Sequence, residues 1–180
     1  MVNYPREVPM EFFQLIEGRH STRGYVSTPV EEPKLQQILT AANRAPSAGN
    51  KQGYEIYVVR SLEQRQALVK AAGDQEFLAE APLVLIFCTH PARLVEWYQE
   101  RGTSLYAIQD ATIACTFAML AASDLGLSTV WVGAFDEQSV RQAANIPPER
   151  RPVAMLPIGY AGAAPRLTPR RDLGDLVHDA

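Results

Sequence analysis

The chain has 180 residues, of which 47% are hydrophobic and 21% are charged, and its formal net charge is −3. This balance is typical of a globular protein, and the length suits a single domain that we expect to span residues 1–180. The small negative charge argues against broad binding of nucleic acid.

Export, membrane insertion and zinc binding are not expected either. The first residues lack an apolar signal core, and the longest apolar run, residues 111–122, is shorter than the roughly 20 residues that span a bilayer. Cys88 and Cys115 stand apart in apolar runs without the spacing of a zinc site, so we expect buried thiols and no metal. We therefore expect a cytoplasmic protein that is not bound to a membrane.

The first third of the chain predicts two helices and a strand. A short helix covers residues 10–17, and the basic segment, residues 19–23, follows it as a loop or the start of a strand. A second helix begins at residues 28–29 and ends before Pro46. Residues 54–59 are rich in aromatic and β-branched side chains and predict a strand.

The middle of the chain contains the most apolar strand candidate. Ser61 is a candidate cap for a helix that reaches residue 73. Residues 82–88 form a continuous apolar run, which indicates a central strand buried on both faces. Another helical segment opens at Pro91 and continues to residue 98.

Residues 103–125 form the longest helix candidate and leave almost no polar face between Asp110 and Ser123. A helix that is apolar nearly all round must be covered by protein. Because a chain this short can hardly cover it alone, we predict a homodimer built on this helix. We expect Asp110, like His90 and the two cysteines, to be structural.

The last part of the chain predicts two strands around a helix, and then a basic tail. The strands cover residues 129–132 and 152–160, Asp136 caps the helix between them, and residues 165–171 are extended. Helices and strands thus alternate around what we expect to be one central sheet, in an α+β or α/β sandwich.

The basic segment suggests an anion site. It contains Arg19, His20, Ser21 and Arg23, and in an extended chain Arg19, Ser21 and Arg23 point the same way. Arginine makes bidentate contacts to phosphate and serine adds a hydroxyl donor, so we expect a phosphate-bearing cofactor here and at the 45–52 loop. The alternative is a solvated charged turn at a helix end.

The protein offers no obvious catalytic groups of its own. The dinucleotide-binding fingerprint, the phosphate-binding loop and the serine nucleophile elbow are all absent, and the three histidines are isolated. For an enzyme, this indicates that a cofactor carries the chemistry while the protein positions and polarises it.

Five stretches form a pattern when taken in order. They are Arg-x-Ser-x-Arg at residues 19–23, the 45–52 loop, the Gly-Ala-Phe motif that ends the stretch 126–135, Leu-Pro-Ile-Gly-Tyr at 156–160, and a tail motif at 170–178. Together they resemble the nitroreductase-like family of flavoproteins. The resemblance implies an α+β, nitroreductase-like α/β/α sandwich with a central, mostly antiparallel sheet flanked by helices, in an intertwined homodimer.

The resemblance also implies a site for FMN at the interface of that dimer, with no catalytic residue beyond the flavin. The implied site consists of residues that contact the phosphate, the ribityl chain and the pyrimidine ring, a loop from the partner subunit, the neighbours of N5, and the tail. These residues are Arg19, His20, Ser21, Arg23, Pro46, Ser47, Ala48, Asn50, Gln75, Gly133, Ala134, Arg170 and Arg171. Two departures concern the flavin surroundings. Gly53-Tyr54 replaces a frequent Pro-Trp, and the region between Phe77 and Asp110 is short, which leaves Trp97, Tyr98 and Tyr106 to cover the site.

The implied activity is ping-pong transfer, in which NADH or NADPH reduces FMN and a small acceptor such as a nitroaromatic or quinone then takes the electrons. Two alternatives stay open. One is a flavoenzyme of the same fold with other chemistry, such as dehalogenation, azoline dehydrogenation or flavin fragmentation. The other is a flavin-binding protein that is not an enzyme. The sequence leaves open the physiological acceptor, the preferred nicotinamide, and whether one or two electrons move at a time.

Overall fold

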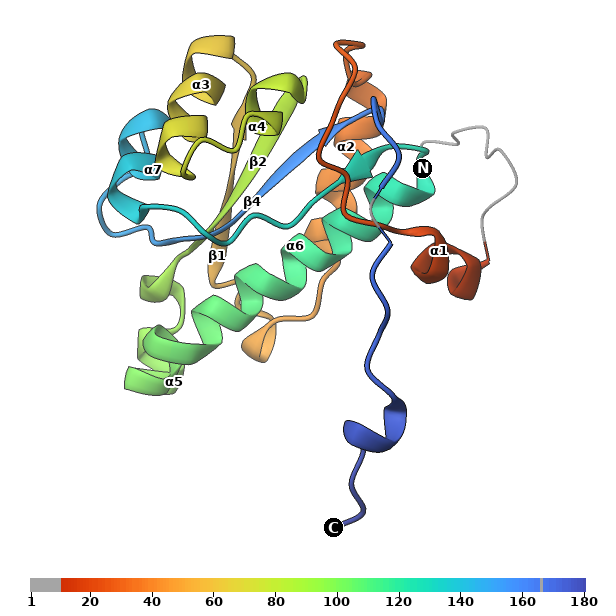
Figure 1. Cartoon of the computed structure of the whole chain (residues 1–180). Coiled ribbons are helices and arrows are strands. Elements are labelled where there is room, and N and C mark those ends of the chain that lie inside the picture. The colour runs from red at the N-terminus through yellow and green to blue at the C-terminus, as the bar shows by residue number, and fades with distance from the viewer. Residues whose placement is uncertain (1–10, 166) are drawn as a thin grey trace.

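An antiparallel sheet forms the middle layer of the molecule (Figure 1). The computed structural model describes residues 11–165 and 167–180. Within them the strands lie in the order β1 (Tyr54–Val59), β2 (Leu83–Thr89), β4 (Pro152–Gly159) and β3 (Ser128–Thr129), and each neighbouring pair is antiparallel. The first residues of the chain, residue 10 of the first predicted helix and Arg166 of the predicted tail lie outside the described residues.

The central strand β2 is buried along its whole length, as its apolar run predicts. Successive side chains of a strand point to opposite faces of the sheet. Leu83, Leu85 and Phe87 therefore join one hydrophobic cluster, while Val84, Ile86 and Cys88 join the other. Both faces of the sheet must accordingly be covered by helices.

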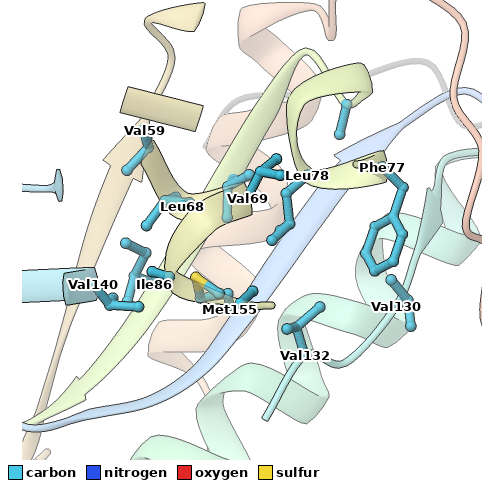
Figure 2. Packing of buried hydrophobic residues seen from close by; sticks show 14 of the residues in the cluster. Val59, Leu68, Val69, Phe77, Leu78, Ile86, Val130, Val132, Val140 and Met155 are labelled. Atoms are coloured by element: carbon cyan, nitrogen blue, oxygen red, sulfur yellow. The ribbon is translucent and has the colours of Figure 1, made fainter. Parts of the chain in front are cut away.

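Helices do cover both faces. On one face lie α2 (Glu32–Asn43) and α6 (Ala107–Asp124), and on the other lie α3 (Leu62–Ala71), α4 (Phe77–Glu80) and α7 (Glu137–Ala143) (Figure 1). Figure 2 shows the second cluster, in which Leu68, Leu78 and Val140 gather around Ile86 and Met155 of the sheet. The expected α+β sandwich with a central antiparallel sheet is confirmed.

Two predicted helix caps are confirmed at the starts of α3 and α7. The Ser61 hydroxyl accepts a hydrogen bond from Gln64 N at 3.2 Å, and the Asp136 carboxylate accepts one from Ser139 N at 2.7 Å. Each bond satisfies a backbone donor that the first turn of a helix leaves without a partner.

The remaining elements lie at the edges of the sandwich. They are the helices α1 (Phe12–Gly18) and α5 (Val95–Arg101), and short turns at Ala48–Asn50, Pro91–Arg93 and Leu173–Asp175. The C-terminal segment runs past α1 and extends away from the sheet (Figure 1).

The predicted helix over residues 103–125 is wrong at its start. The α-helix α6 begins at Ala107, and a π-helical turn, Gly102–Tyr106, joins it to α5. A side chain at Gly102 would come within 2.7 Å of Tyr98 Cβ, so the turn packs closely against the preceding helix. This contact between backbone and side chain favours the wider turn, and hydrophobic periodicity does not reveal it.

Two other boundaries also differ from the prediction. Helix α2 starts at Glu32 with Pro33 in its first turn, and not at residues 28–29. The strand predicted over residues 129–132 is reduced to β3, beyond which Val132 makes an isolated bridge with Met155. The chain leaves the sheet at this point to form part of the site described next.

The helical stretch Val95–Asp124 is long and apolar enough, by length and composition alone, to cross a membrane. Its main part, α6, packs against α2, β2 and β4 within the sandwich. This packing is that of the core helix of a globular domain.

Candidate cofactor site

The basic segment is attached to the edge of the sheet. Ser21 forms a parallel bridge with Thr129 of β3, and Thr22 N donates to Thr129 O at 3.0 Å. Thr22 is buried, Ser21 is half-buried and Arg23 is exposed, the alternation of an extended chain. The sheet therefore fixes the backbone from which the two arginines and Ser21 project.

Arg19 and Arg170 come from opposite ends of the chain and lie close enough to repel each other. Burial first, and the charge of Arg170 second, lower the pKa of Arg19. Within the described residues neither guanidinium forms a salt bridge with a carboxylate. Two neighbouring cations without an anion are the electrostatic pattern of an anion site.

A cavity of about 250 Å³ lies beside Arg19. Besides Arg19 it is lined by His20, Thr22, Ser128 and Pro165, among others. Arg171, the other tail arginine predicted to take part, is turned elsewhere, because its Nη2 donates to Asp175 O at 2.7 Å within the tail itself. The structure thus brings Arg170, and not Arg171, to Arg19.

Gly133 and Ala134 are exposed, and hydrogen bonds to the rest of the protein fix their backbone. Just before them, Val132 and Met155 exchange two backbone hydrogen bonds of 2.9 Å. Gln75 Nε2 donates to Ala134 O at 3.3 Å. All three residues are predicted from the sequence for the site, and the structure brings Gln75 and Ala134 together across 59 positions of sequence.

The parallel bridge sets the direction of the site. Because the basic segment runs alongside residues 127–131 in the same direction, Arg19 lies near the end of α6, and the backbone of Arg23 lies beside the stretch that leads to Gly133. The anion site beside Arg19 is therefore at one end, and Gly133 is at the other. This order suits an elongated ligand with an anionic end.

The 45–52 loop is a compact turn on another part of the surface. The Ser47 hydroxyl accepts from Gln52 N at 3.1 Å, and Ser47 O accepts from Asn50 N at 3.0 Å. Gly49 has φ of 51°, and a side chain there would overlap the Tyr98 hydroxyl. Both the conformation and the nearby Tyr98 hydroxyl therefore favour glycine at this position.

Asp110 of α6 holds this loop, and sequence analysis does not foresee it. The side chain is only 2% exposed, and its Oδ1 and Oδ2 accept hydrogen bonds from Ala48 N at 2.9 Å and Gly53 N at 3.0 Å. A side chain at Gly53 would overlap Leu94 Cδ1 and come within 3.1 Å of Asp110 Oδ2. The close packing of Leu94 and Asp110 against Gly53 thus explains why glycine replaces the frequent proline at this position. The only sequence signal for the contact is an acidic residue in an apolar helix, which needs partners when it is buried.

A second cavity, of about 700 Å³, opens between this loop and the start of α6. Tyr98 and Tyr106 line it and meet edge to face, with ring centroids 5.2 Å apart. Trp97 is oriented differently, with Lys51 Nζ 3.6 Å from the centre of its ring. Two of the three aromatic residues expected to cover the site therefore line a cavity with the loop.

The two groups of predicted residues lie at opposite ends of α6. The cavity beside Arg19 includes Ser123, whereas the loop is attached at Asp110. Ser123 comes 13 positions after Asp110, so at a rise of 1.5 Å per residue the two are about 20 Å apart along the helix. One chain therefore does not bring its own 45–52 loop to its own basic segment.

The cysteines offer no reactive thiol. Cys88 and Cys115 are free and buried, and burial raises the pKa of Cys88 to about 12 and also raises that of Cys115. Within the described residues, no three His, Cys, Asp or Glu side chains gather closely enough to hold a metal ion.

Comparison with known proteins agrees with this architecture. A sequence model of the nitroreductase family matches residues 16–75 and 69–160. The FMN reductase (NAD(P)H) of Bacillus subtilis is 30% identical over 173 residues, covering 89% of this chain and 70% of the relative. Two solved structures are similar. A nitroreductase family protein from Clostridium novyi is 29% identical, with a TM-score of 0.77 over 92% of this chain and 91% of that one. Nitroreductase A from Vibrio parahaemolyticus is 27% identical, with a TM-score of 0.84 over 93% and 74%. Sequence and fold therefore lead to one conclusion, that the chain belongs to the nitroreductase family.

Proposed function

We propose that residues 1–180 form one flavin-binding domain of an FMN-dependent oxidoreductase. It takes hydride from NADH or NADPH and reduces small acceptors such as nitroaromatics or quinones. The observation that carries this proposal is the pair of Arg19 and Arg170, two cations close enough to repel each other, of which Arg19 lines a cavity. The FMN reductase of B. subtilis supports both the cofactor and the electron donor. FMN, when bound, would supply the redox chemistry, and the residues of the chain would bind and orient it.

The donor set suits FMN from one end to the other. Arg19 and Arg170 would neutralise the phosphate, and His20 and Ser21 would hold the ribityl chain. Arg23 would donate to the pyrimidine edge, where a fixed guanidinium would stabilise the negative charge of the reduced ring. Gln75 would present its side-chain oxygen there, because its Nε2 already donates to Ala72 O and Ala134 O. Gly133 and Ala134 would leave one face of N5 open, because neither carries a large side chain.

The second wall of the site comes from a partner subunit. Half-exposed apolar side chains run along α6 at helical spacing, among them Ile113, Phe117 and Leu120. A two-fold axis across this stripe sets one α6 antiparallel to the other. The loop of one protomer, with Pro46, Ser47, Ala48 and Asn50, then reaches the basic segment of the other. A homodimer of this kind overcomes the separation of about 20 Å along α6.

An absorbance spectrum of the purified protein, followed by anaerobic titration with NADH and NADPH, tests the activity. We expect a flavin spectrum that bleaches with at least one nicotinamide, and ping-pong kinetics with a nitroaromatic or quinone acceptor. A cytoplasmic location fits this reaction, since NAD(P)H is available there. A flavin that neither nicotinamide reduces would contradict the proposed electron donor.

The phosphate contact is tested by comparing FMN with riboflavin. We expect Arg19→Ala and Arg170→Ala each to weaken FMN binding by about tenfold or more, because a charge-assisted contact is lost. Riboflavin, which has no phosphate, should bind both variants as it binds the wild type. Arg171→Ala is the matched control and should have a smaller effect, because Arg171 is occupied by Asp175 O. Unchanged FMN affinity in both main variants would overturn the cofactor assignment.

A further inference from the structure

The 45–52 loop is tied to the rest of the protomer by two side chains, Asp110 and Arg93, whose Nε donates to Lys51 O at 2.8 Å. It is a turn in which Gly49, Asn50 and Gln52 all have positive φ, between 49° and 56°. Apart from glycine, residues rarely adopt this conformation, so the turn persists only if its surroundings hold it. The question is which group does so.

Asp110 provides the hold with both of its carboxylate oxygens. Oδ1 accepts from Ala48 N inside the loop, and Oδ2 accepts from Gly53 N just after it, at 2.9 and 3.0 Å. One rigid side chain thus ties two backbone positions that are five residues apart. Because Asp110 is in the long helix α6, it fixes the loop relative to the core of the protomer.

The carboxylate is an ion in an interior setting. It is 2% exposed, and within the described residues no salt bridge partner neutralises it. Burial first, and the charge of Asp110 second, raise the pKa of the neighbouring Tyr54. Burying an ion costs free energy unless the ion is hydrogen-bonded. The carboxylate therefore needs the two amide donors as much as the loop needs the carboxylate.

We propose that Asp110 is a positioning residue for the cofactor. It sets the place of the 45–52 loop and thereby the affinity of the site to which that loop is contributed, which lies in the partner subunit. This inference rests on the proposed function, because it takes the loop to be the second wall of the FMN site. Asp110 does not contact the flavin and acts only through the backbone of the loop.

The first test is the FMN dissociation constant of Asp110→Asn. The amide is nearly the same size but can accept from only one of the two N–H groups and presents an NH2 group to the other. We expect about tenfold weaker FMN binding, as for the loss of a hydrogen bond to a charged group. The control is Ser61→Ala, which also removes one bond from a side chain to the backbone, but at the start of α3. It should lower the melting temperature and leave FMN affinity unchanged.

The second test asks in which subunit the effect appears. Asp110→Asn and Arg19→Ala chains carrying different affinity tags are co-expressed, and the mixed dimer is isolated by two purification steps. One site then combines the altered loop with the altered basic segment, while the other site combines two unaltered walls. We expect one tightly bound FMN per mixed dimer, although each parent dimer binds weakly at both sites.

The outcomes separate this inference from the proposed function. Unchanged FMN affinity in Asp110→Asn, an equal loss in Ser61→Ala, or a mixed dimer without a tight site would each overturn the positioning role. Wild-type protein that binds no FMN would overturn the proposed function itself. If Asp110→Asn does not fold, Gly53→Ala makes the same test, because its methyl group would overlap Leu94 Cδ1 and push the loop away from Asp110.

Discussion

His90 is held in its neutral form by the groups on either side of its ring. Its Nδ1 lies 2.9 Å from Glu55 Oε1, and Arg150 Nη2 lies 2.9 Å from its Nε2. Because arginine can only donate, Nε2 must accept and the proton is on Nδ1, where it is donated to Glu55. Burial first, and the charge of Arg150 second, lower the pKa of His90, although Glu55 opposes both effects.

This arrangement predicts a pH dependence of stability. Below pH about 6.5, the unfolded histidine takes up a proton that the folded His90 resists, so the unfolded state binds more protons. The free energy of unfolding should therefore fall as the pH is lowered from about 6.5 through the depressed pKa of the folded ring. Urea unfolding at several pH values measures this slope. His90→Gln, which does not titrate, should show a smaller slope between pH about 6.5 and 5. An identical slope would contradict the assignment.

Single residues also mark the limit of prediction from sequence. The types of residue suited to an anion, such as Arg19 and Ser21, are visible in five consecutive letters. The role of Asp110 is not, because its two partners are 62 and 57 positions away. The same is true of Gly53, whose requirement comes from Leu94 packing against its backbone. Composition reveals which chemistry is available, and only the folded chain reveals which groups meet.

Strand β2 is the element that the two cores share. Leu85 and Ile86 are neighbours in sequence, are both fully buried, and belong to different clusters. We predict that Leu85→Ala and Ile86→Ala each lower the free energy of unfolding by about 2–5 kcal/mol. In a strand with one solvated face, only one of two such neighbours would lower the stability this much when replaced by alanine. Urea denaturation measures both effects. Leu62→Ala, at a residue that is 53% exposed, is the control and should change stability by about 0.5 kcal/mol or less.

For helices and strands, hydrophobic periodicity predicts the middle of an element better than its ends. The run at residues 82–88 and the caps at Ser61 and Asp136 depend on local sequence, and all three are confirmed. The start of the helix predicted over residues 103–125 depends instead on Gly102 packing against Tyr98. The strand predicted over 129–132 is cut short because the chain leaves the sheet toward Gly133. Such boundaries are decided by tertiary contacts, which an amphipathic pattern does not contain.

For the whole molecule, the proposed dimer can be tested on the exposed stripe of α6. Phe117 is 37% exposed in the single chain. We predict that Phe117→Asp shifts the molar mass in solution from twice 19.9 kDa toward 19.9 kDa, because a charge would be buried between the two helices. Sedimentation or light scattering measures the mass, and FMN binding should fall with it. Leu62→Asp places the same charge on the opposite side of the sandwich and should leave the dimer intact. A dimeric Phe117→Asp protein would exclude this stripe as the interface.

The separation of the two walls along α6 has a consequence for dilution. In the proposed dimer, folding of a protomer is a unimolecular event that by itself yields only two incomplete halves of different sites. Completion of a site is bimolecular, so the proposed cofactor and the second protomer are linked by mass action. Flavin would then favour association, and association would favour flavin retention, by the same factor. In this scheme the amount of active enzyme in a cell rises more than proportionally with the concentration of the chain.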